Sequence, residues 1–525
     1  MENIEGNAGG QITSGAHQSY WIASTEPLKF ERLSENLNTE VAIVGAGISG
    51  LTVAYCLLKS GKKVVVLEDG FIGSGETGRT TAHIANALDD RYSEIESYFG
   101  AQGAKYAAES HTSAIDLIEE ICTDEAIDCD FRRVDGYLFL HPSDKRKSIE
   151  DEYKYTHKAG ISTELVMEAP SIKQEGPFLK YPRQAQFHPL KYLNGLAEAV
   201  VRMGGEIFTN THADTIKEGI INANGHEVKA SYIVVATNTP VNDWFTIHTK
   251  QFAYRSYVIA ARVPKNAIDV ALWWDTGDAN SEWPTMPYNY VRTQPLDENN
   301  YLLIHGGADH ETGQANKDGI REEDRYQQLE AWLREHFPQA GEIRYKWSGQ
   351  VMEPMDDMAY IGKNPGDDNI YIVTGDSGNG ITHGTVAGIL ISDLINGIPN
   401  PWAELYDPSR ITLKAMGTLL QEQAKIFSQF KDYLLPSDVK SLSEIRNGEA
   451  AIVGGLKKIA VYRDSKGQYR AYSAVCPHMG CVVQWNNDEK SFDCPCHGSR
   501  FTCEGKVING PAKTDLSQVD VPQKA

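Results

Sequence analysis

Two short cysteine–histidine loops near the C-terminal end constrain this 525-residue chain more than any other feature. The first loop reads C-P-H-M-G-C from Cys476, and the second reads C-P-C-H-G-S from Cys494. Each loop offers one cysteine and one histidine, in the order C-x-H and then C-x-x-H, with His478 in the first and His497 in the second. Fifteen residues separate His478 from Cys494, which is enough for a strand, a turn and a returning strand that brings the loops face to face.

Iron is the metal that this ligand set suits best. Thiolates bind iron well, and a [2Fe–2S] centre in which two imidazoles replace two thiolates on one iron is the Rieske type. The pattern predicts such a cluster, with Cys476 and Cys494 on one iron and His478 and His497 on the other. A tetrahedral zinc site is the alternative. Zinc fingers usually pair like ligands, however, whereas here each loop supplies one cysteine and one histidine.

The loops resemble those of the Rieske proteins of cytochrome bc complexes, whose motifs are C-T-H-L-G-C and C-P-C-H-G-S. The resemblance implies a disulfide between Cys481 and Cys496, a Ser499 hydroxyl bonded to a cluster sulfide, and a covering proline loop at Gly510-Pro511. The family's tyrosine two residues after that serine is Phe501 here. Hydrogen bonds around the sulfurs stabilise the reduced cluster, so we expect a reduction potential below that of the respiratory proteins.

Composition and charge are those of a soluble globular protein of two to four domains. Hydrophobic residues make up 41% of the chain, and the formal net charge of −21 argues against nucleic acids or anionic membranes as partners. No run of about eighteen apolar residues and no export signal is visible, so we expect no transmembrane helix and a cytoplasmic location. Disulfides are rare in that compartment, which leaves the oxidation state of Cys481 and Cys496 open at this point.

A dinucleotide-binding unit is predicted from Val41 onward. A buried strand, Val41–Val44, leads into G-A-G-I-S-G and a helical pattern, and a second buried strand, Val64–Leu67, follows. Glycines at these positions let the backbone approach a pyrophosphate at a helix N-terminus, and an acid after the second strand can bind a ribose hydroxyl. The candidate cofactor residues of this unit are Gly45, Gly47, Gly50 and Glu68.

Two later segments, Tyr232–Ala236 and Ile370–Thr374, are predicted to return to the same sheet. The second runs into the glycine loop G-D-S-G-N-G-I-T-H-G and an apolar helix, Val386–Ile395, which favours anion binding; a tight turn is the alternative. Further cofactor candidates are Thr237, Gly375, Gly378, Gly380 and Thr382. Four intervening strand-like segments predict an inserted antiparallel sheet that faces the substrate: Gly136–Leu140, Phe252–Arg262, Tyr288–Thr293 and Tyr301–Ile304.

The single nucleotide unit, the inserted sheet and the glycine loop resemble the D-amino-acid oxidase-like family of FAD oxidoreductases over about residues 20–402. A flavoprotein of the disulfide-reductase kind needs two GxGxxG units, and only one is present. The segment G-E-T-G-R-T-T-A-H-I stands where the family contacts the FAD phosphates and packs beside the flavin. The resemblance implies Arg79, Thr80 and Thr81 as FAD contacts, with an exposed loop arginine as the alternative.

The resemblance bears on the substrate pocket as well. T-T-A-H is similar to the T-T-W-H of dimethylglycine and sarcosine dehydrogenases, which implies either a covalent flavin bond or a hydrogen-bonding role for His83. The family's W-x-G-x-R arginine is Val351 here and its P-x-I-G proline is Ala359, which puts the holding of an anionic substrate in doubt. Pocket candidates that alternate on one predicted strand are Tyr288, Tyr290 and Arg292, with His305 and His310 as further candidates; an ordinary solvent-facing strand and a turn are the alternatives.

The predicted fold class is an α/β FAD-binding fold, a Rossmann-like βαβ unit with an inserted antiparallel substrate sheet, followed by a small all-β Rieske domain. The predicted domains are a disordered tail over 1–19, an oxidoreductase over 20–408 with the insert at about 91–150 and 245–345, a linker helix over 409–435, and the Rieske domain over 436–525.

The combination resembles a known bacterial fusion of these two families. It implies a dehydrogenase in which a small amine, amino acid or hydroxy acid reduces FAD, and the [2Fe–2S] cluster passes single electrons to an external carrier. A reductase or oxygen-using enzyme fed by a ferredoxin-like donor is one alternative, and a non-catalytic redox sensor is another. A Rieske oxygenase is excluded, because no segment has the spacing of a two-histidine, one-carboxylate iron site.

Overall fold

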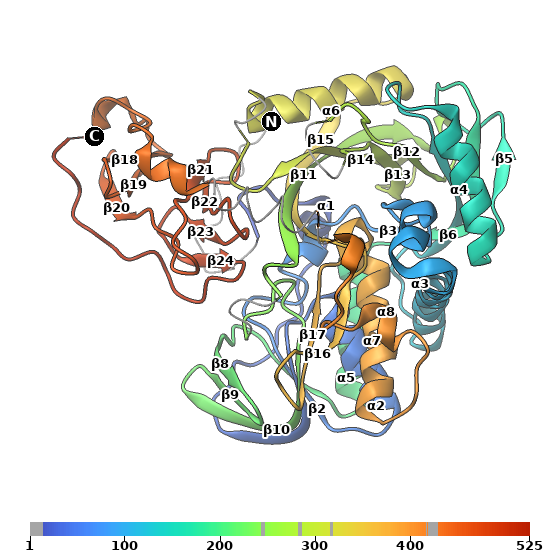
Figure 1. Cartoon of the computed structure of the whole chain (residues 1–525), viewed down its shortest axis with the longest axis horizontal. Coiled ribbons are helices and arrows are strands. Elements are labelled where there is room, and N and C mark those ends of the chain that lie inside the picture. Colours follow the sequence, from blue (N-terminus) through green and yellow to red (C-terminus); the bar gives the residue numbers. More distant parts are fainter. Residues whose placement is uncertain are drawn as a thin grey trace.

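A computed structural model describes residues 14–242, 247–281, 286–315, 319–415, 417 and 429–524. Three parts can be distinguished: a parallel sheet with helices, an antiparallel sheet above it, and a small β domain at one side (Figure 1). Of the predicted disordered tail, residues 1–13 lie outside the described residues. The stretch from Ser14 to Ser19 is ordered instead, because the Ala16 amide donates to Glu489 and the Ser14 carbonyl accepts from Arg500, both in the C-terminal domain.

The nucleotide-binding sheet has the strand order β16-β17-β10-β1-β2-β7. Its strands are β1 (Leu37–Val44), β2 (Val64–Leu67), β7 (Glu206–Phe208), β10 (His226–Val235), β16 (Tyr360–Lys363) and β17 (Ile370–Thr374), with a β8–β9 hairpin (Ala213–Lys217, Ile220–Ala223) beside β10. The strands β7, β2, β1, β10 and β17 are parallel, and β1 places Val44 beside both Leu67 and Val235. Such runs of valine and isoleucine are typical of strands buried on both faces.

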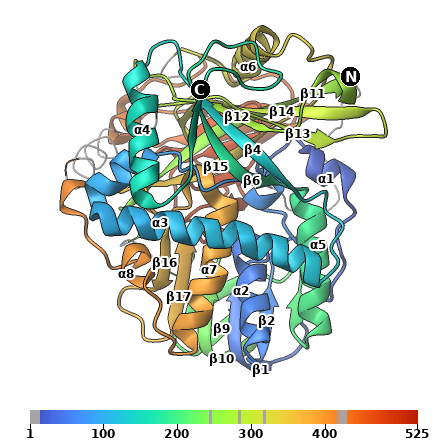
Figure 2. The ribbon, with the colours of Figure 1, turned by 90° about the vertical axis from the view of Figure 1, so that its right-hand side faces the viewer.

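Helices cover this sheet on the side seen in Figure 2, where α3 lies across them. They are α2 (Ile48–Lys59), α5 (Pro189–Arg202) and α7 (Gly380–Ile395), with α1 (Tyr20–Ser24), α8 (Ala403–Tyr406) and the short turns η1 (Glu76–Arg79) and η3 (Ser377–Asn379) at the margins. The predicted βαβ unit and both predicted returns, β10 and β17, are confirmed. Their apolar runs are continuous, so local pattern was sufficient to find them.

The antiparallel sheet has the order β15-β11-β14-β13-β12-β4-β6-β3, with β5 beside β6, and one of its pairs, β12 with β4, is parallel. Its strands are β3 (His83–Ile84), β4 (Arg132–Phe139), β5 (Glu164–Val166), β6 (Phe178–Gln186), β11 (Gln251–Pro264), β12 (Leu272–Asp275), β13 (Tyr290–Pro295), β14 (Asn300–Glu311) and β15 (Ile343–Pro354). The helices α3 (Arg91–Asp124), α4 (Arg146–Ala159) and α6 (Glu322–His336) and the turn η2 (Lys265–Ala267) complete this part.

The insert is larger than the sequence suggested. Its first segment extends to Gln186 rather than to about 150, because β6 pairs along the whole of β4. Its second segment extends to Pro354 rather than to about 345, because β15 pairs with β11 down to Gln251. The four predicted strands of the insert are present as β4, β11, β13 and β14, although Tyr288 lies just before β13.

The C-terminal domain consists of two small antiparallel sheets, β18-β19-β20 and β21-β22-β23-β24. Their strands are β18 (Glu449–Val453), β19 (Ile459–Arg463), β20 (Tyr469–Ser473), β21 (Gln484–Asn486), β22 (Ser491–Asp493), β23 (Arg500–Thr502) and β24 (Val507–Asn509), after the turn η6 (Leu442–Glu444). Twelve residues of the predicted linker helix, 416 and 418–428, lie outside the described residues. Its described flanks are 3-10 turns, η4 (Leu413–Ala415) and η5 (Phe430–Leu434). None of the helices in the described part of the chain has the length and apolar character needed to span a membrane.

Candidate active site and cluster site

The four predicted cluster ligands lie together in the C-terminal domain. Cys476 and His478 follow β20, Cys494 and His497 follow β22, and the two imidazole rings are 4.9 Å apart. All four side chains are buried. The Nδ1 atom of His497 has no hydrogen-bond partner among the described residues, so it is free to bind a metal. Two thiols and two imidazoles from facing loops therefore fit a Rieske cluster.

The disulfide implied by the resemblance is present between Cys481 and Cys496, whose Cα atoms are 6.4 Å apart. It joins the two loops directly behind the ligands and leaves Cys476 and Cys494 for the metal. The buried Ser499 hydroxyl accepts a hydrogen bond from the Ala512 amide at 3.1 Å, which holds the proline loop against the second ligand loop.

A cavity of about 990 Å³ lies between the two large sheets and receives residues from both. This volume is at the upper end of the usual range for ligand sites, about 300–1,000 Å³. The G-A-G-I-S-G loop forms one end of it, where a Cβ atom on Gly50 would lie 1.9 Å from the Gly45 carbonyl oxygen. Only glycine therefore allows the loop to fold this closely at the start of α2, as an FAD pyrophosphate requires.

Glu68 lies at the carboxyl end of β2 in the same cavity. Its carboxylate accepts hydrogen bonds from the amides of Ala46 at 2.7 Å and Gly70 at 2.8 Å. Burial raises the pKa of Glu68, and these amide bonds act against the rise. The carboxylate is thus held beside the glycine loop, where the fingerprint puts the ribose.

Twelve of the predicted cofactor and pocket residues line the cavity: Gly45, Gly47, Glu68, Arg79, Thr80, Thr81, His83, Thr237, Tyr288, Tyr290, Gly378 and Gly380. Gly50 lies beneath the glycine loop. Gly375 turns the chain after β17 with φ +67°, and the Thr382 hydroxyl bonds His111 and the Asn379 carbonyl. Neither Gly375 nor Thr382 lines the cavity.

His83 lines the cavity with both ring nitrogens engaged. Nε2 donates to the Val291 carbonyl at 3.2 Å, and Nδ1 accepts from the Thr81 hydroxyl at 3.1 Å. Burial, assisted by Arg292, lowers the pKa of His83 to about 3, so the ring is neutral. This arrangement favours the hydrogen-bonding role over the covalent one, because a covalent bond to the flavin would displace one of these partners.

Three other predicted pocket residues lie away from the cavity. Arg292 is completely buried and donates to the carbonyl oxygens of Ala82 at 2.6 Å and Phe187 at 3.0 Å, so it has a structural role. His305 contacts Asn289 at 3.0 Å, and His310 contacts the Tyr257 hydroxyl at 3.0 Å. A strand pattern gives the face of a side chain, but it does not give how far along the strand a cavity extends.

Arg79 lines the cavity but its guanidinium points to the C-terminal domain. Nη1 donates to the Ser348 carbonyl at 2.8 Å and lies 3.4 Å from a carboxylate oxygen of Glu489, a residue between β21 and β22. Arg255 of β11 lies 3.1 Å from the same oxygen. Burial raises the pKa of Glu489, but Arg79 and Arg255 outweigh it and hold this pKa well below its usual range. A buried ion-pair network thus joins the two domains.

The cluster loops lie directly against the cavity wall. The Gln350 side chain donates to the Gly498 carbonyl at 3.0 Å, and Gln350 itself lines the cavity. A Cβ atom on Gly498 would lie 2.3 Å from the Cβ of Ala253 in β11. Residues 507–510, from β24 into the proline loop, also line the cavity. One layer of residues therefore separates the cluster ligands from the cavity.

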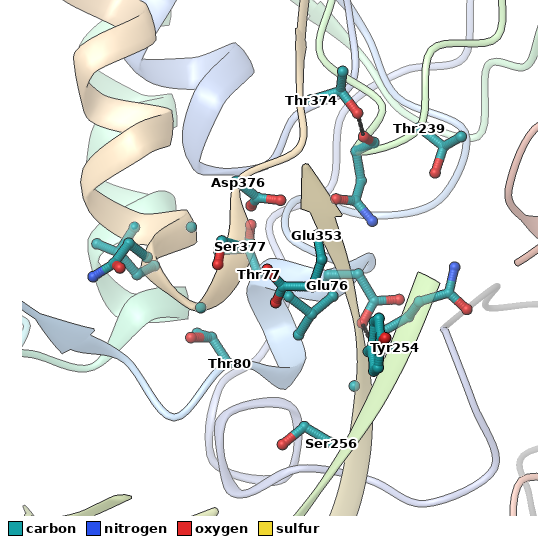
Figure 3. A pocket seen from close by; sticks show the side chains of 18 of the residues that line it. Glu76, Thr77, Thr80, Thr239, Tyr254, Ser256, Glu353, Thr374, Asp376 and Ser377 are labelled. Atoms are coloured by element: carbon teal, nitrogen blue, oxygen red, sulfur yellow. Dashed lines mark hydrogen bonds between the residues drawn. The ribbon is translucent and has the colours of Figure 1, made fainter. Parts of the chain in front are cut away.

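Several functional candidates were not found from the sequence. They are the cavity-lining residues Asp89, Tyr254, Ser256, Asp309, Gln350, Glu353, Asp376 and Ser377. Figure 3 shows Glu353, Asp376 and Ser377 close together, with Tyr254 and Ser256 on the neighbouring strand. Isolated acids and hydroxyls have no motif; the one available signal was Asp376-Ser377 within the glycine loop.

Comparison with known proteins agrees with both halves of this architecture. Residues 40–394 match the family described as FAD dependent oxidoreductase (DAO), and residues 436–520 match the Rieske [2Fe-2S] domain. The Rieske match favours the two-iron cluster over zinc. The Bacillus subtilis protein YhfW, which is named for a Rieske 2Fe-2S centre, is 32% identical over 516 residues, covering 96% of this chain and 98% of that protein.

Two further relatives match the flavin part. The gamma-glutamylputrescine oxidoreductase of Escherichia coli is 27% identical over 396 residues, covering 72% of this chain and 89% of that protein. The crystal structure of glycine oxidase from Geobacillus kaustophilus has a TM-score of 0.59 at 18% identity, covering 72% of this chain and all of that one, and shows the shared fold. The chain therefore belongs to the FAD dependent oxidoreductase family and carries a C-terminal Rieske domain, with FAD and a [2Fe–2S] cluster as its cofactors.

Proposed function

We propose that this protein is a dehydrogenase that oxidises a small amine or amino acid and passes the electrons through its Rieske cluster to an external one-electron carrier. The substrate loses a C–H and an N–H hydrogen, a C=N bond forms, and two electrons and two protons leave. Bound FAD takes up two electrons at once, whereas the cluster carries one.

The single observation that carries this proposal is the Gln350 contact. Gln350 lines the cavity and its amide bonds the backbone of Gly498, which directly follows the ligand His497. The cluster loops therefore lie within one residue of the cavity that receives the flavin. Such proximity would serve no purpose if the two centres worked on separate reactions.

The orientation of the cluster ligands supports the same route. His478 and His497 are 6% and 4% exposed, and the His478 ring lies 5.3 Å from His248 of the flavin part. The imidazole side of the cluster site is thus covered by the flavin part. We infer that electrons between the flavin and the cluster cross this face, and that the external carrier docks elsewhere on the C-terminal domain.

The preference for an amine over substrates that carry a carboxylate, whether amino acids or hydroxy acids, rests on the pocket. Val351 occupies the position of the family's arginine, and Arg292 is bound to carbonyl oxygens, so these two positions offer no arginine to a substrate carboxylate. The name of the E. coli relative, gamma-glutamylputrescine oxidoreductase, supports the amine class. The cytoplasmic location stays a prediction.

An anaerobic titration of the holoprotein tests the proposal. A panel of amines, amino acids and hydroxy acids is added while the flavin absorbance and the electron paramagnetic resonance signal of the reduced cluster are followed together. We expect an amine to bleach the flavin and to produce the cluster signal without any donor.

The matched control is Cys494→Ser, which removes a cluster ligand. It should keep the flavin bleaching and lose the cluster signal. Flavin that stays oxidised with every substrate but is reduced by a ferredoxin-like donor would refute the dehydrogenase direction in favour of the reductase alternative.

A further inference from the structure

Carboxylates line the part of the cavity next to the antiparallel sheet. They are contributed by the N-terminal end of α3, by β14 and β15, and by the loop after β17. The six that form this acidic wall are Asp89, Asp90, Asp309, Glu353, Asp357 and Asp376.

Aromatic residues and hydroxyls complete the acidic wall. The rings of Tyr288 and Tyr290 are 5.1 Å apart, and the Tyr290 hydroxyl bonds the Ser256 hydroxyl at 2.6 Å. A Cβ atom on Gly378 would lie 1.7 Å from the Asp89 carboxylate and 3.0 Å from the Tyr288 hydroxyl, so both of these groups point toward Gly378. Carboxylates beside tyrosine faces are the groups that recognise ammonium ions.

The acidic wall has little positive charge of its own. Among the described cavity-lining residues, the arginines and lysines are Arg79, Arg91, Lys217 and Lys513. Arg79 is paired with Glu489, and Arg91 donates to the Thr276 carbonyl at 2.7 Å beside Asp89 and Asp90. Burial raises the pKa of Glu353, the charges of Asp90, Asp89 and Asp309 raise it as well, and the Ser377 hydroxyl acts against the rise.

The pKa values of these carboxyl groups reflect their burial and the excess of negative over positive charge around them. Burial and the charge of Asp89 raise the pKa of Asp309 to about 7, although the Ser256 hydroxyl and Arg325 act against the rise. Burial raises the pKa of Asp89 and of Asp376 to about 6. Close carboxylates that outnumber their counter-charges, here Arg91 and Arg325, resist ionisation, and an ammonium ion placed among them would reduce that resistance.

Unpartnered polar atoms provide a second and independent indication of a ligand. One carboxylate oxygen each of Asp309 and Asp357 is buried without a hydrogen-bond partner among the described residues. The Ser377 hydroxyl also lines the cavity, is 5% exposed and lies within reach of the Glu353 and Asp90 carboxylates. Buried polar groups are almost always hydrogen-bonded in folded proteins, so the two carboxylate oxygens indicate that a bound molecule with donor groups completes the site.

We propose that the substrate of this cavity is an oligoamine, a flexible chain with at least two amino groups, whose distal ammonium is held by Asp309, Asp89 and the Tyr288–Tyr290 pair. A diamine can present one neutral amine for oxidation while its second, charged amine contacts the acidic wall. This inference specifies the substrate class of the proposed function. The redox step depends on the proposed function, whereas the binding of the oligoamine does not.

The test compares 1,4-diaminobutane with butylamine, which has the same carbon chain and one charge less. Both are added anaerobically to the holoprotein, and binding is measured by the flavin absorbance change and by the shift in thermal midpoint. We expect the diamine to bind at least tenfold more tightly, and Asp309→Asn to reduce that preference about tenfold. Asp128→Asn, which changes an exposed aspartate outside the cavity, should leave it unchanged.

Equal binding of the two amines, tighter binding of glycine or proline, no binding of the diamine, or an unchanged preference in Asp309→Asn would each overturn the inference. The redox proposal fails separately: a diamine that binds but leaves the flavin oxidised would refute the dehydrogenase and keep the oligoamine site.

Discussion

Replacing Glu489 with glutamine is predicted to loosen the contact between the C-terminal domain and the flavin part. Glutamine keeps the shape of the side chain and removes its charge. The Glu489 carboxylate lies 3.1 Å from Arg255 and 3.4 Å from Arg79, and it accepts a hydrogen bond from the Ala16 amide at 2.6 Å. The Glu489 side chain is 1% exposed and both arginine side chains are 0% exposed, so the substitution leaves two buried positive charges uncompensated.

The expected free-energy cost of Glu489→Gln follows from that burial. Removing one partner of a buried ion pair costs about 3–5 kcal/mol. The lower end applies here, because the terminal nitrogens of Arg255 make no well-aligned hydrogen bond and the Arg79 contact is long. A loss of about 3 kcal/mol corresponds to a roughly 100-fold smaller ratio of docked to undocked domains.

Hydrogen–deuterium exchange checks this prediction. The amides of β15 around Ser348 and of the loop Cys494–Gly498 should lose up to about 100-fold in protection in Glu489→Gln. Glu342→Gln, at a 70% exposed side chain just before β15, is the matched control and should behave as the unaltered protein. Unchanged protection and an unchanged thermal midpoint in Glu489→Gln would refute the reasoning.

The same network predicts a response to acid. The pKa of Glu489 lies below its unfolded value of about 4.3. Its stabilisation is therefore fully present above pH about 4.3 and is lost as the pH falls toward the folded value. The protection factors of the same amides, which correct for the slower intrinsic exchange in acid, should change little between pH 7 and that limit.

Three further outcomes are expected. Gly50→Ala should lower the flavin content of the purified protein at least tenfold, since its Cβ would meet the Gly45 carbonyl at 1.9 Å; normal flavin absorbance would contradict this. Cys481→Ser should destabilise the C-terminal domain by about 3 kcal/mol, because the disulfide to Cys496 closes a loop of 15 residues, and urea unfolding measures it; an unchanged midpoint would argue against it. The affinity for 1,4-diaminobutane should rise as the pH increases from about 6 to 8, because burial raises the pKa of Asp309 to about 7 and its carboxyl ionises over this range. Without ligand, the raised pKa of Asp309 should make the protein less stable as the pH rises from about 4 to 7, because the buried carboxyl then ionises at a cost. Thermal melts with and without the diamine measure both effects.

Much of the fold could be predicted because its signals are local. The predicted strand Ile370–Thr374 has the same bounds as β17, and the βαβ unit around Gly45 is where its glycines and apolar runs put it. The four candidate cluster ligands, which the structure brings together, were predicted in the same way, since each loop carries its own cysteine and histidine within a few residues.

Long-range pairing explains what was missed. Tyr290 and Arg292 alternate on β13, yet only Tyr290 lines the cavity, because Ala82 and Phe187 cover the strand two residues further along. Arg79 was expected at the FAD phosphates, and its partner Glu489 lies 410 residues away. Neither covering residues nor a distant counter-ion has a sequence signal.

The sequence by itself determined the two cofactor chemistries of this protein. A glycine loop between buried strands and a cysteine–histidine pair on each of two loops encode binding geometry within short stretches of chain. The closeness of the two sites, in contrast, depends on the tertiary structure. Gln350 bonds the cluster loop, and Asp309 and Glu353 line the same cavity from β14 and β15. That proximity arises because the packing of sheets and domains brings together residues that are far apart in sequence, and local residue preferences contain no record of such packing.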